Sequence, residues 1–154
     1  MVVLQAWSTL DGPVTASPPV GRLKLMRIDQ FTGGMVCRVT ALDSPRSNSL
    51  CTAPNMHFAI ERGVGVASDV AVDLWQQLVR LPQGEQARCH LPRFAIGLSK
   101  AGILRWAAAV CWKCNNISLR CDREYTWRAF DSESPQALRL LAEVRSHVEK
   151  GADN

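Results

Sequence analysis

Two alternating apolar runs separated by a turn signal constrain the fold of this chain most strongly. Phe94, Ile96 and Leu98 alternate with small residues, and a second alternating run covers residues 104–112. Between the two runs, residues 100–102 are Lys-Ala-Gly, which is typical of a tight turn. The pattern predicts a β-hairpin. Because one face must be buried, only pairings whose residue numbers have an even sum are allowed.

The hairpin belongs to a larger predicted sheet. Residues 117–121 and 125–130 have the apolar and aromatic content of two further strands, which completes a four-stranded antiparallel meander within residues 87–130. Two helices are also expected. The first follows an N-cap at Ser68 or Asp69, and the second has Ser134 as its N-cap.

Each predicted helix has one apolar stripe and therefore needs a surface to cover. The stripes consist of Val70, Leu74, Leu78 and Leu81 in the first helix, and of Leu138, Leu141, Val144 and Val148 in the second. Pro135 occupies the first position of the second helix, where its missing N–H group is tolerated. We therefore expect an α+β fold, an antiparallel β-sheet meander with two amphipathic helices packed on it.

The N-terminal part of the chain gives weaker signals. Residues 2–7 are predicted to form a short strand, and the Gly-Gly pair at 33–34 predicts a hairpin turn ahead of the strand at 35–42. Residues 43–54 are polar and rich in Pro, Ser and Asn, which predicts a long loop before a short apolar piece at 56–60.

Length and composition set the broad class of protein. With 154 residues, the chain is expected to form one domain spanning 1–154, with a motif-bearing half at 88–148. A chain of this size typically buries about 68–70% of its unfolded surface, so its core needs neither disulfides nor metal. No apolar run approaches the roughly 18 residues of a membrane span, and residues 1–10 lack the features of a signal peptide. We therefore expect a cytoplasmic protein with no membrane partner.

Charge and cysteine are concentrated in the same stretch. Residues 88–128 contain eight Lys and Arg against two Asp and Glu, in a chain whose formal net charge is +4. Four of the six cysteines also lie in this stretch. Because the cytosol keeps thiols reduced, clustered cysteines there indicate metal or thiol chemistry more than structural disulfides.

A zinc site is the first interpretation of the cysteines. Cys111 and Cys114 can supply two ligands if their chain bends at a turn, and Asn115 tolerates the left-handed backbone that such a turn needs. By the parity of the hairpin, Cys89 and Cys111 share the face opposite to Phe94. The candidate zinc ligands are Cys89, His90, Cys111 and Cys114, with Cys121 as a substitute.

Two other interpretations use the same cysteines. In a thiol–disulfide protein, Cys111 and Cys114 would form a reversible bond with Cys89 as a third partner, although the strand-like residues 115–119 provide no helix N-terminus to favour a thiolate. Alternatively, these cysteines are buried sheet residues that only contribute to packing.

The sequence shows neither a Gly-rich phosphate loop nor a recognisable Ser/His/Asp or paired-carboxylate grouping, so hydrolase chemistry has no visible carrier, and a non-enzymatic role is favoured over an enzymatic one, which stays open. The main expectation is a small binding protein with a protein partner and zinc as its candidate cofactor. The alternatives are a thiol–disulfide redox protein and an immunity-type inhibitor of a partner toxin. Nucleic acid is a less favoured partner, suggested by Trp112 and Trp127 beside Lys113 and Arg128.

Three segments also resemble a known set of proteins. Residues 89–98 begin Cys-His-Leu-Pro-Arg, residues 109–117 contain Cys-Trp-Lys-Cys, and residues 127–131 read Trp-Arg-Ala-Phe-Asp before a Leu-rich helix. The chain is similar in these segments to small uncharacterised bacterial proteins that share a C-(H/F)-x-P-R … C-(W/F/Y)-x-C hairpin motif. The similarity covers residues 88–148. It implies a bacterial cytosolic setting and a common Cys site, and it brings no known activity.

Overall fold

The structure, a computed structural model, describes residues 30–85 and 87–151. Within these residues, seven strands form one antiparallel sheet in the order β2-β3-β1-β4-β5-β6-β7. The elements are β1 (Gly33–Leu42), β2 (Ser49–Ala53), β3 (Met56–Val66), α1 (Ser68–Val79), β4 (Phe94–Lys100), β5 (Ile103–Cys111), β6 (Asn116–Cys121), β7 (Glu124–Ala129) and α2 (Pro135–Lys150). The α+β class is confirmed. The strand order departs from a simple meander, since β1 lies between β3 and β4.

The hairpin formed by β4 and β5 has the expected even-sum register from Phe94 to Leu98, but beyond a register shift Ser99 pairs with Leu104, an odd sum that was not expected. Phe94 pairs with Val110 and Leu98 pairs with Trp106, so both pairs have even sums. The turn is at Ala101 and Gly102, both with positive φ angles, 50° and 76°. Strands β6 and β7 continue the sheet where the sequence predicts them. Local alternation and turn chemistry therefore determine this half of the sheet.

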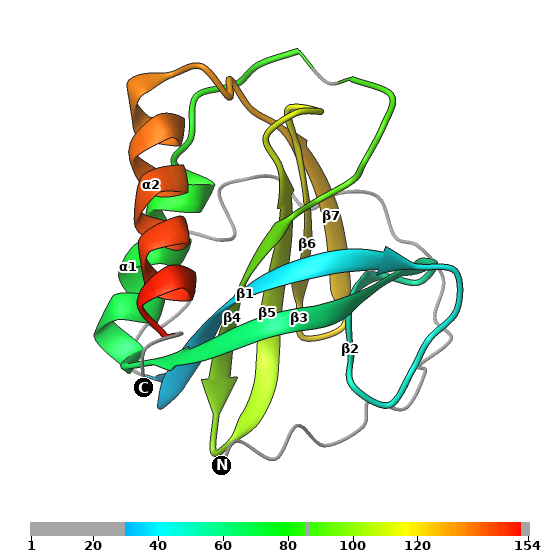
Figure 1. The fold of residues 1–154 in the computed structure, drawn as a ribbon, viewed down its shortest axis with the longest axis vertical. Coiled ribbons are helices and arrows are strands. Elements are labelled where there is room, and N and C mark those ends of the chain that lie inside the picture. Colours follow the sequence, from blue (N-terminus) through cyan, green and yellow to red (C-terminus); the bar gives the residue numbers. More distant parts are fainter. Residues whose placement is uncertain (1–29, 86, 152–154) are drawn as a thin grey trace.

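The sheet curls so strongly that its first edge strand approaches the other edge. Register shifts between Arg38 and Val39 in β1, and between Leu98 and Ser99 in β4, mark irregularities of the bulge type, which bend and twist a strand. As a result β2 contacts β5, β6 and β7. Figure 1 shows β1 and β3 crossing in front of the β5 and β6 strands, while α1 and α2 stand side by side along one flank.

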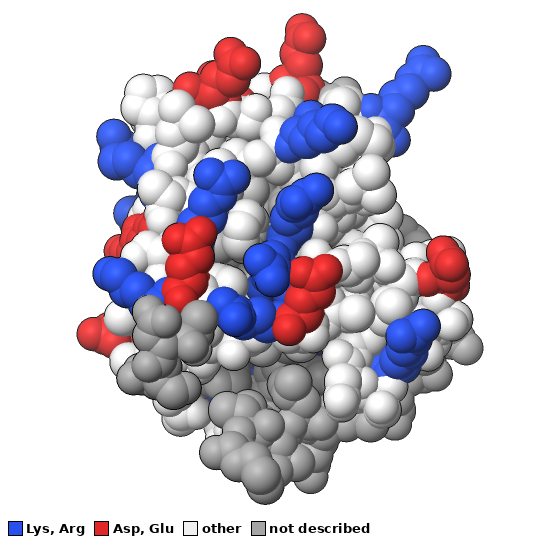
Figure 2. Space-filling model, viewed as in Figure 1, with Lys and Arg blue, Asp and Glu red and all other residues white. Residues whose placement is uncertain are grey.

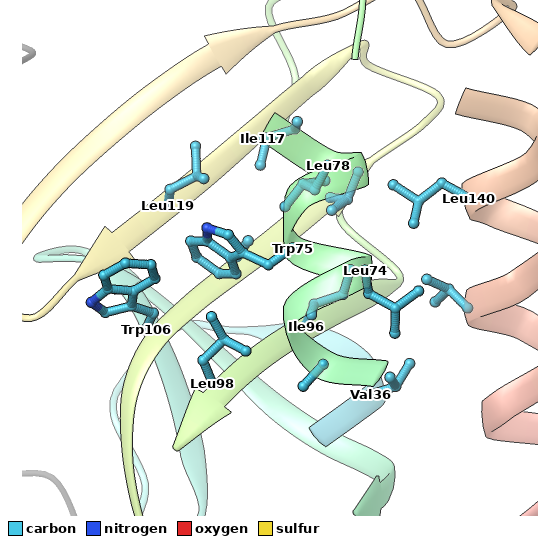
Figure 3. Packing of buried hydrophobic residues seen from close by; sticks show 14 of the residues in the cluster. Val36, Leu74, Trp75, Leu78, Ile96, Leu98, Trp106, Ile117, Leu119 and Leu140 are labelled. Atoms are coloured by element: carbon cyan, nitrogen blue, oxygen red, sulfur yellow. The ribbon is translucent and has the colours of Figure 1, made fainter. Parts of the chain in front are cut away.

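The curled sheet separates two apolar cores. The helix-side core joins α1 and α2 to one face of the sheet, and Figure 3 shows Trp75 of α1 beside Trp106 of β5, with Leu140 of α2 nearby. These two tryptophan rings are 5.4 Å apart between centroids. The inner core lies on the opposite face, enclosed by the curl. It consists of Cys37, Val39, Leu50, Phe58, Ala95, Leu104, Ala107 and Ala109.

Helix α2 begins as expected but presents a slightly different face. The side chain of Ser134 accepts a hydrogen bond from the backbone N–H of Ala137, which confirms the predicted N-cap. The buried positions are Ala137, Leu140, Val144 and Val148. Leu138, predicted to face the core, is 53% exposed. The predicted stripe is therefore wrong in its first half, where Ala137 and Leu140 are buried in place of Leu138 and Leu141, and correct at Val144 and Val148.

Two N-terminal expectations are wrong. Gly33 and Gly34 lie within β1 and form no turn. A Cβ atom at Gly34 would overlap Ala71 of α1 and the carbonyl oxygen of Gly97, so this glycine lets the helix and a neighbouring strand approach closely. The predicted long loop at 43–54 contains strand β2, and the short piece at 56–60 is the start of the eleven-residue strand β3. The strand expected at 2–7 lies outside the described residues.

Candidate functional site

The connection between α1 and β4 carries the most chemically distinctive group of side chains. Residues 87–93, here called the tethered segment, contain neither helix nor strand. The segment runs beside the turn between β5 and β6, where the backbone N–H of Ala87 donates to the carbonyl of Cys114 at 3.0 Å. At its other end, the carbonyl of Arg93 accepts from the N–H of Val39 at 2.9 Å. Pro92 is buried between these anchors.

A disulfide fixes the middle of the tethered segment. Cys89 is bonded to Cys114, with a sequence separation of 25 residues. Cys89 is exposed, whereas Cys114 is fully buried in the turn between β5 and β6. The redox interpretation expected a bond between Cys111 and Cys114, but in the structure Cys114 is bonded to Cys89 and Cys111 is free. Parity could not place Cys89, because it precedes β4 and belongs to no strand.

Cys111 remains a free, buried thiol close to the disulfide. Its Sγ atom accepts a hydrogen bond from the backbone N–H of Cys114 at 3.2 Å. Asn115 adopts the left-handed backbone that the sequence predicted for this turn, with φ of 55°. Cys111 therefore lies next to the residue that holds one end of the bond, without taking part in it.

Cys121 does not belong to this group. It ends β6, about 16 Å along the strand from Asn116 at roughly 3.3 Å per residue. Burial, with a smaller contribution from the Asp122 and Glu124 carboxylates, raises the pKa of its thiol to about 12. The distance and the raised pKa both separate Cys121 from the chemistry of the turn.

The candidate zinc ligands are not arranged around a common point in this disulfide-bonded form. In the part of the chain that the structure describes, no three His, Cys, Asp or Glu side chains are placed to hold a metal ion. Cys89 and Cys114 use their sulfurs for each other, and both ring nitrogens of His90 have protein partners. Zinc binding therefore stays a prediction that concerns the reduced chain.

A hydrogen-bonded network fixes the ring of His90. The amide nitrogen of Asn116 donates to the carbonyl of Cys89 at 2.6 Å, which turns its oxygen towards Nδ1 of His90. Nδ1 therefore carries the proton and donates to Asn116. Nε2 then accepts from the hydroxyl of Ser118 at 3.0 Å, and Ser118 in turn accepts from Thr52 of β2 at 2.6 Å. This order of donors is that of a neutral imidazole protonated at Nδ1.

Burial supports the same protonation state. It lowers the pKa of His90, and this effect exceeds the opposing contribution of the hydrogen bond to Asn116. Two aromatic rings flank the imidazole edge-on, Phe58 at 6.0 Å and Trp127 at 4.5 Å between centroids. The neutral ring of His90 therefore links the tethered segment to the interior of the curled sheet through its hydrogen bonds and aromatic contacts.

Ser118, His90 and Asn116 have the order of partners found in some hydrolytic sites, a grouping that the sequence analysis missed. Ser118 is completely buried, and its hydroxyl also bonds Thr52. A nucleophile must reach its substrate, so the network positions the segment and offers no accessible hydroxyl. The alternation of Asn116 and Ser118 on one face of the predicted strand was the available signal, but nothing in the sequence placed His90 opposite them.

The residues proposed for nucleic-acid binding are partly used inside the fold. The guanidinium of Arg128 donates to the carbonyls of Val79 and Leu81 at the end of α1. The indole N–H of Trp112 donates to the carbonyl of Ala137 at 3.2 Å. On the described part of the face in Figure 2, basic and acidic side chains are interspersed. These contacts favour structural roles for Arg128 and Trp112.

Large apolar side chains are exposed around the same site. Leu91 of the tethered segment is 63% exposed, and Trp127, whose ring contacts His90, is 37% exposed. Arg88 and Arg93 on the segment are also exposed. The site therefore combines a rigid irregular segment, two apolar side chains in solvent and two cations.

Comparison with known protein families, curated proteins and solved structures finds no match to this chain. The resemblance of residues 88–148 to small bacterial proteins stays a prediction. Neither α1 nor α2 is long and apolar enough to cross a membrane, among the residues that the structure describes.

Proposed function

We propose that this chain is a small non-enzymatic binding protein, and that the tethered segment together with Trp127 is its recognition surface. The observation that carries the proposal is the combination of restraint and exposure at residues 87–93. Cys89 is fixed by a covalent bond and His90 by side-chain hydrogen bonds, while the next residue, Leu91, is 63% exposed. Irregular segments held on a rigid scaffold are common sites of recognition.

Restraint before binding makes such a surface effective. A flexible segment loses conformational entropy when a partner orders it, whereas a segment that is already fixed avoids most of that loss. Trp is enriched among the residues that dominate binding energy in protein interfaces. We therefore expect Leu91 and Trp127 to make the main apolar contacts with a partner.

The charge of the segment supports an acidic partner. Arg88 and Arg93 lie on either side of Leu91 in the sequence, and both are exposed. Complementary charge steers association and selects partners. We infer an acidic polypeptide segment with at least one apolar or aromatic residue as the ligand. An inhibitor of a toxin would be one such binding protein, and its target would present an acidic surface.

A random peptide library displayed on phage tests this proposal. We expect selection on the full chain to enrich acidic peptides that contain an aromatic or aliphatic residue. Leu91→Glu should weaken their binding at least about tenfold, which corresponds to about 1.4 kcal/mol. Leu138→Glu is the matched control, because Leu138 is 53% exposed on α2 and lies outside the tethered segment. Enrichment without acidic bias, or equal loss in the two variants, would refute the proposal.

A further inference from the structure

We propose that Cys89, Cys114 and Cys111 form an exchange site, in which the disulfide moves from Cys89–Cys114 to Cys111–Cys114 and releases the tethered segment. This inference rests on the proposed function, since it supplies a means of regulating the same surface. It also explains why a third cysteine lies beside a disulfide whose other end is exposed. In the cytoplasmic setting that the sequence predicts, disulfides are usually catalytic or redox-sensing.

The geometry of the turn favours the second bond. Cys111 ends β5 and pairs with Asn116, the first residue of β6, so only four residues lie between the paired positions. Within a tight turn, Cα atoms three residues apart are less than about 7 Å from each other. That separation overlaps the range of about 4.4–6.8 Å found for disulfides. A bond between Cys111 and Cys114 is thus compatible with the paired strands.

The attacking sulfur already lies beside its target residue. Sγ of Cys111 is 3.2 Å from the backbone nitrogen of Cys114. Both residues are buried, at 1% and 0% exposure. External thiols are therefore hindered from reaching either residue, and Cys111 is placed for an intramolecular reaction.

The reaction is a thiol–disulfide exchange with no net change in oxidation state. The Cys111 thiol loses its proton and the thiolate attacks Sγ of Cys114. The Cys111–Cys114 bond forms as the Cys89–Cys114 bond breaks, and Cys89 leaves as a thiolate and takes up a proton from water. Because Cys89 is exposed, its charge is solvated as it leaves. No external oxidant or reductant is consumed.

Exchange would loosen the tethered segment while leaving the sheet intact. The original bond closes a separation of 25 residues, whereas the new bond joins residues only three apart in the sequence. The segment would then be held by its backbone contacts and by the side chains of His90 and Pro92 alone. A binding surface that depends on restraint should accordingly lose affinity for acidic peptides.

Disulfide mapping of the full chain tests the exchange. The protein is incubated in a buffer of reduced and oxidised glutathione, quenched with acid, alkylated and digested for mass spectrometry. We expect a species with a Cys111–Cys114 bond and an alkylated Cys89. Cys111→Ser should abolish this species. Cys37→Ser, the matched control, should retain it, because Cys37 is a buried free thiol in the inner core and burial raises its pKa to about 12.

A second variant makes the result independent of the exchange rate. When Cys89→Ser is refolded from denaturant with oxidised glutathione, both thiols are accessible in the unfolded chain, and we expect the Cys111–Cys114 bond to form and the refolded variant to have a native circular dichroism spectrum. If Cys111 and Cys114 stay as thiols or as glutathione adducts in the folded variant, the exchange site is refuted. This failure is distinct from failure of the proposed function, because peptide binding by the wild-type chain requires no exchange.

Peptide affinity then tests the regulatory role. Oxidised Cys89→Ser should bind the selected acidic peptides at least about tenfold more weakly than wild type, a difference of about 1.4 kcal/mol. Amide hydrogen exchange at residues 87–93 should be faster in the variant, while exchange in β4–β6 stays unchanged. Equal affinity and equal exchange in the two proteins would overturn the proposed regulation.

Discussion

Removing the Cys89–Cys114 bond should destabilise the fold by an amount that follows from the length of chain it closes. The two residues are separated by 25 positions. In the chain-entropy relation, a crosslink of this span lowers the entropy of the unfolded chain by about 12 cal/mol/K, or about 3.5 kcal/mol near 25 °C. For a chain of 154 residues, this corresponds to a decrease in Tm of about 7–14 °C. Cys89→Ser is the appropriate variant, because the exposed serine adds no buried polar group.

Urea unfolding of three samples measures this effect. These are oxidised wild type, wild type reduced with a phosphine, and Cys89→Ser with the same phosphine present, so that no alternative bond forms. We expect the two reduced samples to agree with each other and to lie about 3.5 kcal/mol below oxidised wild type in free energy of unfolding. The urea concentration at the midpoint of unfolding should also be lower in the two reduced samples.

Two outcomes would refute this reasoning. If reduction changes the free energy of unfolding of wild type by less than about 1 kcal/mol, the bond does not restrain the unfolded chain as the relation requires. If Cys89→Ser is much less stable than reduced wild type, the serine disturbs native contacts and the loss does not arise from the crosslink.

Three further predictions concern packing, pH and helix termination. Gly34→Ala should cost about 1–3 kcal/mol through overpacking against α1, whereas Gly65→Ala, where a Cβ meets nothing within 4 Å, should be nearly neutral in thermal unfolding. Because burial lowers the pKa of His90, its imidazole takes up a proton at a higher pH in the unfolded state than in the folded state. Stability should therefore fall as pH drops through about 6.5 and level off below the folded pKa, and urea titrations of His90→Gln should lack this slope. Arg128→Met leaves carbonyls at the end of α1 without their donor, which should cost about 1–3 kcal/mol in urea unfolding. Equal stability of Arg128→Met and the exposed-site control Arg123→Met would contradict this last expectation.

The elements that the sequence predicted correctly depend on local chemistry. The β4–β5 hairpin follows from alternation with period two, and its turn from the ability of Gly102 to adopt positive φ. The second helix follows from Ser134 and Pro135, whose capping and backbone preferences act within one turn. Asn115 likewise has the left-handed backbone expected of it.

One error is local, since the N-cap of α1 is Ala67, without a side-chain hydrogen bond, and not Ser68 or Asp69. The other errors involve contacts between residues distant in sequence. Gly34 resembles a turn residue, but its role is to leave space for Ala71 of α1 and for the backbone of β4. A glycine needed for close approach and one needed for a turn look identical in a sequence. Strand β2 was likewise not recognised, because the residues around it in the sequence are polar and its conformation depends on pairing with β3.

The disulfide was not predictable for a related reason. Connectivity among several cysteines depends on their positions in space, and the sequence alone does not determine it. Periodicity placed Cys111 at the end of a strand, but Cys89 lies in a segment that has no periodicity. The position of Cys89 follows instead from Asn116, whose amide binds the Cys89 carbonyl and whose oxygen fixes His90.

The curl of the sheet links these distant contacts to the candidate site. Thr52 comes from β2, Ser118 from β6 and His90 from the tethered segment, so three separate parts of the chain meet in one line of hydrogen bonds. A flat sheet with the same strand order would place β2 and β6 five strand spacings apart, about 24 Å at 4.8 Å per spacing. Only a curled sheet brings Thr52 to Ser118. The bulges that bend the strands therefore also determine where His90 and the exposed Leu91 beside it are held.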